Sequence, residues 1–297
     1  MKKLTTILLA TAALLVAAVS CNKEGNEPED KMAVLSYEVN LSEVTKAIGD
    51  GLTADKLACA VYDGETLYAK ATVAKADGKF AYTPSLYYGK TYTVVFFAYK
   101  DGVYAVSDDL KTITRSGNGE AADAFTYKET VKINADGTLT INGAASTQTA
   151  SDHEVILTRP FAQLNIGTAD LTGMTKVTVT LSSCAASYSA QAGAYAGSQD
   201  VTYTSTASEF SSSKFTVDGT DYSPVSLNYL FAADSNVKAT IEVYNGDNLI
   251  RTVIVDNVPL KANQKTNIYG NLVKGNLTFN VTMNAGFNGT GNNETIE

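Results

Sequence analysis

The 297-residue sequence contains no tryptophan, only one histidine and three cysteines. One histidine cannot supply a metal site built from several imidazoles, and without a Cys-x-x-Cys pair the common zinc and thiol-redox motifs are excluded. His153 follows Ser151 and Asp152, but consecutive side chains on a strand point to opposite faces, so these residues cannot form a catalytic triad. We therefore predict no enzymatic activity, no metal site and no cofactor, and we expect His153 to be a surface residue before a strand.

Basic residues are also scarce. The chain has 23 Lys and Arg residues against 31 Asp and Glu residues, which gives a formal net charge of −8. Proteins that bind nucleic acid usually carry a basic patch or stripe that contacts phosphates. The composition therefore predicts no nucleic-acid partner, and it is typical of an acidic protein that is weakly attracted to anionic surfaces.

The first 20 residues have the organisation of a secretory signal peptide. Lys2 and Lys3 form a basic start, and residues 4–19 form an apolar run that ends among small residues. This run is shorter than the roughly 20 apolar residues that a membrane-spanning helix needs. We interpret residues 1–20 as a cleaved signal peptide, with an uncleaved membrane anchor as the alternative.

The signal peptide ends in Ala-Val-Ser-Cys, which resembles a bacterial lipobox. In such signals the cysteine, here Cys21, is lipidated and becomes the first residue of the mature protein. The motif departs from the usual pattern at Ala18, where leucine is common, and cleavage after a small residue without lipidation is the alternative. Residues 21–32 are polar and mostly acidic, which predicts a solvated tether with no core of its own.

Most of the remaining chain consists of short alternating or apolar runs between turn signals. Leu35, Tyr37, Val39 and Leu41 alternate with polar residues, which predicts a half-buried strand. Residues 91–99 are too apolar for one face to meet water, so they are expected to form a central core strand. This pattern predicts an all-β protein, and β-sandwiches fit it best.

Turn residues mark several hairpins. Asp136-Gly137 and Asn245-Gly246 each separate two apolar runs, and Asn-Gly is the strongest short hairpin signal. Residues 182–213 are rich in Ser, Ala, Gly, Thr and Tyr, and because structureless loops of that length are uncommon, we expect some strand within them. Most of the 17 tyrosines are expected in core or cross-strand positions, with a carbohydrate-binding surface as the alternative.

A polar run at residues 146–152 divides the predicted strands into two groups. We predict an N-terminal sandwich domain at residues 33–150 and a C-terminal sandwich domain at residues 151–297. Cys59 and Cys184 then fall in different domains, and buried free thiols are favoured over a disulfide between them.

Residues 45–64, TKAIGDGLTADKLACAVYDG, resemble the fimbrillin-type major pilins of Bacteroidetes. Residues 157–168 look like the strand that opens the second domain of these pilins, and residues 258–272 look like their late strands. The resemblance implies two transthyretin-like β-sandwich domains in tandem. It also implies export as a lipoprotein to the cell outer membrane and a structural role in a fimbria that serves adhesion.

The resemblance further implies assembly with other pilin subunits, as a homopolymer or a heteropolymer. In this family a surface protease removes the lipidated segment together with the first strand, and a strand from another subunit fills the emptied groove. The cut site corresponds to Lys46-Ala47, where the family has arginine before the cut and this chain has lysine. An arginine-specific protease is not expected to act here. The departing strand carries an inward row of four residues: Leu35, Tyr37, Val39 and Leu41.

The run at residues 277–283 alternates in the same way as the departing strand. Its apolar row is Leu277, Phe279, Val281 and Met283, so we consider it a candidate donor strand. The equally favoured alternative is that it closes the second sandwich. As an alternative function, the chain is a monomeric, lipid-anchored surface protein that binds host protein or glycan ligands.

Overall fold

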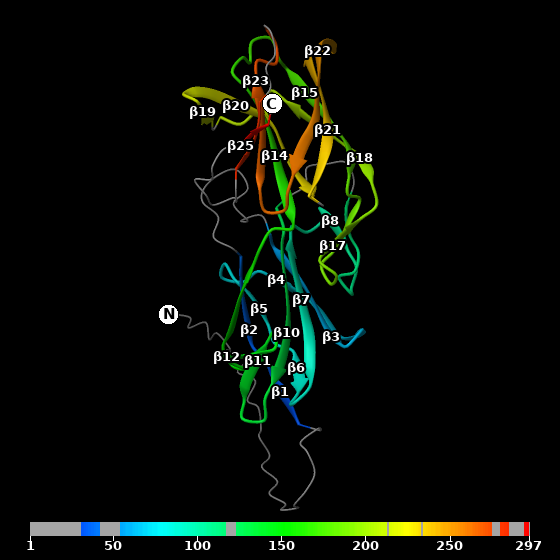
Figure 1. Cartoon of the computed structure of the whole chain (residues 1–297), viewed down its shortest axis with the longest axis vertical. Helices are drawn as coiled ribbons and strands as arrows, with labels where there is room; N and C mark the ends of the chain where they lie inside the picture. The colour runs from blue at the N-terminus through cyan, green and yellow to red at the C-terminus, as the bar shows by residue number, and fades with distance from the viewer. Residues whose placement is uncertain are drawn as a thin grey trace, which may run out of the picture.

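The computed structural model confirms the all-β class, since every regular element of the described residues is a β-strand. The structure describes residues 31–41, 54–116, 123–212, 214–232, 234–274, 280–284 and 294–296. Two stacks of sheets follow one another along the long axis of the molecule (Figure 1). Within the described residues, no helix is present that has the length and apolar character to cross a membrane.

The first stack, at the bottom of Figure 1, contains a six-stranded sheet in the order β12-β11-β10-β7-β3-β4. Its strands are β3 (Lys56–Asp63), β4 (Thr66–Ala74), β7 (Thr91–Tyr99), β10 (Phe125–Ile133), β11 (Thr138–Ile141) and β12 (Ala144–Thr149). The apolar strand β7 pairs with both β3 and β10 and is the central core strand that the sequence predicts. The predicted hairpin at Asp136-Gly137 joins β10 to β11.

A smaller sheet in the order β13-β2-β5 covers one face of the six-stranded sheet. Its strands are β2 (Tyr37–Leu41), β5 (Phe80–Tyr82) and β13 (His153–Leu157), and beside them β1 (Met32–Val34) pairs with β6 (Ser85–Tyr87). The apolar residues between the two sheets form one core that includes side chains from β2, β3, β5, β7, β10 and β13. This arrangement is a β-sandwich.

Strand β13 lies beyond the domain boundary that the sequence suggests at residue 151. It pairs in parallel with β2, and Val155 and Leu157 belong to the same core as β2. Because the first core is incomplete without these side chains, we propose to place the end of the first domain after Leu157.

The second stack, at the top of Figure 1, also packs two sheets against each other. One sheet has the order β19-β20-β14-β23-β24-β25, and the other has the order β18-β15-β21-β22. The strands of the first are β14 (Phe161–Thr168), β19 (Phe215–Val217), β20 (Thr220–Phe231), β23 (Lys265–Gly270), β24 (Asn280–Asn284) and β25 (Glu294–Ile296). The strands of the second are β15 (Lys176–Cys184), β18 (Gln199–Thr206), β21 (Ser235–Asn245) and β22 (Asn248–Leu260). The predicted hairpin at Asn245-Gly246 joins β21 to β22.

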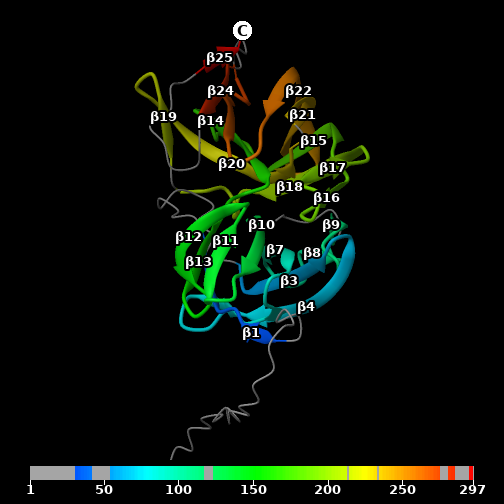
Figure 2. The same ribbon diagram turned by 60° about the horizontal axis from the view of Figure 1, so that its bottom comes forward.

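Residues 182–213 contain strands, as expected, and some of them connect the two stacks. Here β16 (Ser187–Ser189) and β17 (Ala194–Ala196) join β8 (Tyr104–Val106) and β9 (Ile113–Arg115) in one sheet (Figure 2). Rings from both stacks meet at Tyr104 on β8. Its ring centroid lies 5.9 Å from that of Phe97 on β7 and 5.5 Å from that of Phe161 on β14. The two sandwiches therefore share a third hydrophobic cluster.

Several smaller predictions are confirmed in the cores. Cys59 and Cys184 are buried free thiols that lie in different hydrophobic clusters. Burial raises the pKa of the Cys184 thiol to about 11. The buried tyrosines include Tyr82, Tyr92, Tyr99 and Tyr104.

Candidate functional site

Strand β2 is the first strand of the sandwich core, and it lies between two neighbours that come from distant parts of the chain. It pairs in parallel with β13, where Val39 is opposite Val155, and antiparallel with β5, where Val39 is opposite Phe80. The backbone just before it is also bonded on both sides: Leu35 N–H donates to Pro84 at 2.9 Å, and the next N–H donates to the carbonyl of residue 150. Removing this strand would therefore expose two unpaired edges that face each other.

The inward row that the sequence predicts is confirmed. Leu35, Tyr37 and Val39 are 2% exposed or less, and Leu41 is half-buried and packs against the same core. The Tyr37 ring meets Phe96 edge-on, with ring centroids 5.0 Å apart. The alternation places Tyr37, Val39 and Leu41 on one face of β2, because successive residues of a strand point to opposite sides. Leu35 lies between β1 and β2 and enters the same core.

The outward side chains of β2 form polar contacts with both neighbouring strands. Lys79 Nζ lies 2.5 Å from Glu38 Oε1, and Asn40 Nδ2 donates to Glu154 Oε1 at 2.7 Å. The hydrogen bond from Lys79 holds the pKa of the Glu38 carboxyl below its ordinary value. These groups are exposed to solvent, where such pairs contribute little to stability. The inward row, not this outer face, therefore holds β2 in place.

The expectation that His153 lies on the surface is wrong. Its side chain is 2% exposed, and Nε2 lies 2.7 Å from Oε1 of Glu129, a carboxylate on β10 that is itself fully enclosed. Tyr37 Oη donates to the same Oε1 at 2.8 Å, and Tyr127 Oη donates to Oε2 at 3.1 Å. Buried polar groups need hydrogen-bond partners, and this network supplies them between β2, β10 and β13.

The sequence held a signal for this network that composition alone did not reveal. Along β10, Glu129 occupies the inward row between the apolar side chains of Phe125 and Ile133, where a carboxylate requires a buried partner. Burial, followed by the charge of Glu129, raises the pKa of the Tyr37 hydroxyl well above its ordinary value. The same two causes raise the pKa of Tyr127 to about 12. Both hydroxyls are therefore neutral hydrogen-bond donors near neutral pH.

Several predicted site residues lie outside the described residues: Cys21, Lys46, Ala47, Leu277 and Phe279. Cys21 precedes the described residues, and Lys46 and Ala47 fall in the interval between β2 and β3. Leu277 and Phe279 come just before β24 in the sequence.

Val281 and Met283 belong to strand β24, which pairs antiparallel with β23 and brings Val281 opposite Ile268. In this chain, β24 is thus a member of a sheet of the second sandwich, which is the alternative arrangement for the candidate donor strand.

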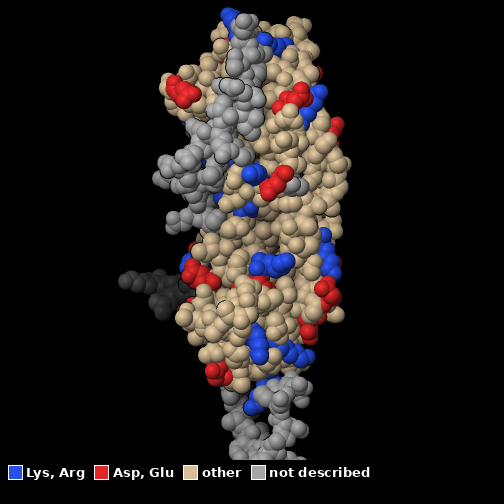
Figure 3. Space-filling view, in the orientation of Figure 1, with Lys and Arg blue, Asp and Glu red and all other residues tan. Residues whose placement is uncertain are grey.

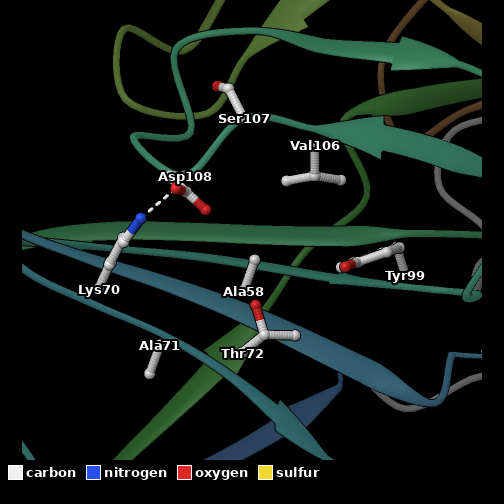
Figure 4. Close-up of a pocket in the computed structure, with 8 residues that line it drawn as sticks. All are labelled: Ala58, Lys70, Ala71, Thr72, Tyr99, Val106, Ser107 and Asp108. Carbon is white, nitrogen blue, oxygen red and sulfur yellow. Dashed lines mark hydrogen bonds and ion pairs between the residues drawn. The ribbon is translucent and has the colours of Figure 1, made fainter.

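The surface offers a shallow pocket that differs in character from the β2 site. It has a volume of about 170 Å³ and lies between β3, β4 and the segment that follows β8 (Figure 4). Lys70 and Asp108 form an ion pair at its rim, while Tyr99 and Ala58 line its base.

The described residues contain no cluster of three or more His, Cys, Asp or Glu side chains that could hold a metal. On the face shown in Figure 3, acidic and basic side chains lie scattered among neutral ones.

The family model that matches the chain covers residues 28–297 and is described as a family of unknown function, DUF6562. The chain belongs to this family. A comparison with curated proteins gives no match.

Solved structures resemble this DUF6562 chain along most of its length. A fimbrial assembly protein from Parabacteroides distasonis is 14% identical, with a TM-score of 0.50 over 86% of this chain and 96% of the other. The tip fimbrial protein Mfa3 from Porphyromonas gingivalis is 10% identical, with a TM-score of 0.46 over 85% of this chain and 99% of the other. At such identities the first likeness shows a shared fold, which is the fold expected from the resemblance to Bacteroidetes fimbrial proteins.

Proposed function

We propose that this chain is a non-enzymatic structural subunit of a cell-surface fimbria, a type V pilus that serves adhesion, and that it assembles with other pilin subunits by β-strand exchange. The observation that carries this proposal is the position of β2. This short strand near the start of the described chain fills the middle of a sheet, and together with Leu35 just before it contributes the buried residues Leu35, Tyr37 and Val39 to the core.

The energetics of exchange follow from this position. Burying Leu35 and the three inward side chains of β2 contributes roughly 6–12 kcal/mol, an upper bound because the unfolded chain already buries some surface. Among the strands that the structure describes, β2 is the one that pairs with both β5 and β13, so its removal leaves the apolar groove and these two edges open. An incoming strand restores both the apolar burial and the backbone pairing. Its backbone hydrogen bonds supply affinity, and the alternating pockets for its side chains supply specificity.

Processing precedes exchange in this proposal. Lipidation at Cys21 carries the precursor to the cell outer membrane, where more than one acyl chain gives stable anchoring. Cleavage between Lys46 and Ala47 then separates residues 32–41 from the remainder of the chain. Because lysine stands before the cut, we propose a protease that accepts lysine.

The donor strand comes from a neighbouring subunit. A candidate on this chain is the run at residues 277–283, whose alternating row Leu277, Phe279, Val281 and Met283 matches the row of β2. In a fibre this run would leave β23 of its own subunit and enter the groove of the next.

Two purified proteins test the proposal. A chain that lacks residues 1–46 should form concentration-dependent ladders that resist SDS, whereas a chain that begins at residue 22 and keeps β2 should stay monomeric. Replacing Phe279 and Val281 with Asp should stop the ladders if the candidate run is the donor. A truncated chain that remains monomeric at high concentration would support the alternative, a monomeric surface lipoprotein that binds host protein or glycan.

A further inference from the structure

The groove beneath β2 contains one polar position. Of the four inward residues, Leu35 just before β2 and Val39 and Leu41 on β2 meet the apolar core. The fourth, Tyr37, meets the core with its ring and the Glu129 carboxylate with its hydroxyl. Any strand that replaces β2 must therefore satisfy a buried carboxylate as well as fill apolar pockets.

The groups that stay behind after exchange cannot provide this hydrogen bond themselves. Gln148 Oε1 accepts the backbone N–H of Glu154 at 2.9 Å, so His153 Nδ1, which faces the same oxygen, acts as a donor to it. His153 Nε2 already contacts Glu129 Oε1, at 2.7 Å. Tyr127 is occupied with the other carboxylate oxygen, Oε2. The hydroxyl that Tyr37 gives to Oε1 is therefore the part of the network that departs with β2.

The walls around this position select an aromatic ring. The Tyr37 ring centroid lies 5.0 Å from that of Phe96 and 4.8 Å from that of His153, and the Tyr82 ring lies 6.5 Å away. A serine or threonine in this place would leave the space of the ring empty, and cavities in a close-packed core are costly. A phenylalanine would fill the space but remove the hydrogen bond that Tyr37 Oη donates to Glu129 Oε1.

We infer that the strand which best completes this groove carries a tyrosine at the position of Tyr37, in the pattern apolar-x-Tyr-x-apolar. This inference rests on the proposed strand exchange and specifies its partner. The preferred occupant is a strand of another subunit with this pattern.

The chain's own candidate donor run is the weaker partner. When Leu277 is placed on Leu35, Phe279 falls on Tyr37, and shifting the run by two residues brings Leu277 or Val281 to the same place. In each of these registers an apolar side chain meets Glu129. A hydrogen bond from a neutral donor to a buried carboxylate changes affinity by about 10- to 100-fold, which sets the expected discrimination between donors.

Peptide competition tests this inference on the mature chain. Residues 45–48 are replaced by the recognition sequence of a site-specific protease, the chain is cut, and a labelled peptide of residues 32–42 is exchanged into the groove under mild denaturant. Unlabelled competitors are then compared: the same peptide, its Tyr37→Phe variant, and a Glu38→Gln variant as a matched control on the exposed face. Peptides of residues 276–284, with and without Phe279→Tyr, complete the set.

We expect Tyr37→Phe to weaken competition about 10- to 100-fold and Glu38→Gln to leave it unchanged. Phe279→Tyr should strengthen the peptide of residues 276–284 by a similar factor. Equal competition by the tyrosine and phenylalanine peptides would overturn the inference and leave strand exchange standing. If even the labelled peptide of residues 32–42 fails to enter the groove, the proposed exchange fails, and the inference fails with it.

Discussion

Leu35, which lies between β1 and β2, offers a sharp test of whether the segment of residues 35–41 is an integral part of the core. Its side chain is 0% exposed, whereas that of its neighbour Val34 is 48% exposed. Replacing a fully buried leucine with alanine removes apolar contacts and leaves a cavity, at a cost of about 2–5 kcal/mol. Replacing an exposed side chain generally changes stability by about 0.5 kcal/mol or less. We therefore expect Leu35→Ala to lower the free energy of unfolding by about 2–5 kcal/mol and Val34→Ala to have little effect.

Equilibrium urea denaturation of the two variants measures this difference. The chain has no tryptophan, so unfolding is followed by far-ultraviolet circular dichroism or by tyrosine fluorescence. The dependence of the unfolding free energy on urea should be the same in both variants, because it scales with the surface exposed on unfolding. Similar midpoints for Leu35→Ala and Val34→Ala would show that β2 is not packed as described, and would remove the physical basis for exchange.

Three further predictions concern the rest of the fold. Asp123→Asn should lower the free energy of unfolding by about 3–5 kcal/mol, because Arg159 and Asp123 form a buried ion pair with Nη2 2.8 Å from Oδ2. Thermal denaturation will measure this loss of stability. Tyr127 should contribute its full stabilisation below about pH 10 and lose it between about pH 10 and 12, because burial raises its pKa in the folded chain to about 12 while its unfolded value is near 10. Thermal unfolding midpoints at pH 9 and pH 11 will show whether stability falls in this direction. Cys59 and Cys184 should react with a thiol reagent only after denaturation, and rapid labelling of the native chain would contradict their burial.

The local pattern of the sequence predicts the strands more fully than their pairing. Alternation identifies β2 and its inward row because the period of two fixes which face each side chain occupies. The same reasoning cannot find the partner of β2, because β13 follows more than a hundred residues later and no local signal links them. For this reason the polar run before His153 suggests a boundary at residue 151, although β13 belongs to the first core.

The buried network shows a second limit of reading the sequence. His153 lies beside polar residues and was expected at the surface, yet it is enclosed because Glu129 on β10 provides its partner. Glu129 interrupts an otherwise apolar row, and that interruption is visible in the sequence, but its meaning depends on which side chain lies opposite. Tertiary pairing supplies that information, and alternation does not.

The amino terminus of the subunit within fimbriae shed from cells tests the central claim most directly. Terminal sequencing or mass spectrometry of the polymer measures it without any engineered change. If strand exchange follows cleavage between Lys46 and Ala47, the subunit in the polymer should begin at Ala47, with residues 32–41 absent. A subunit that begins at lipidated Cys21 and retains residues 32–41 would contradict the account, because its groove would still hold its own first strand.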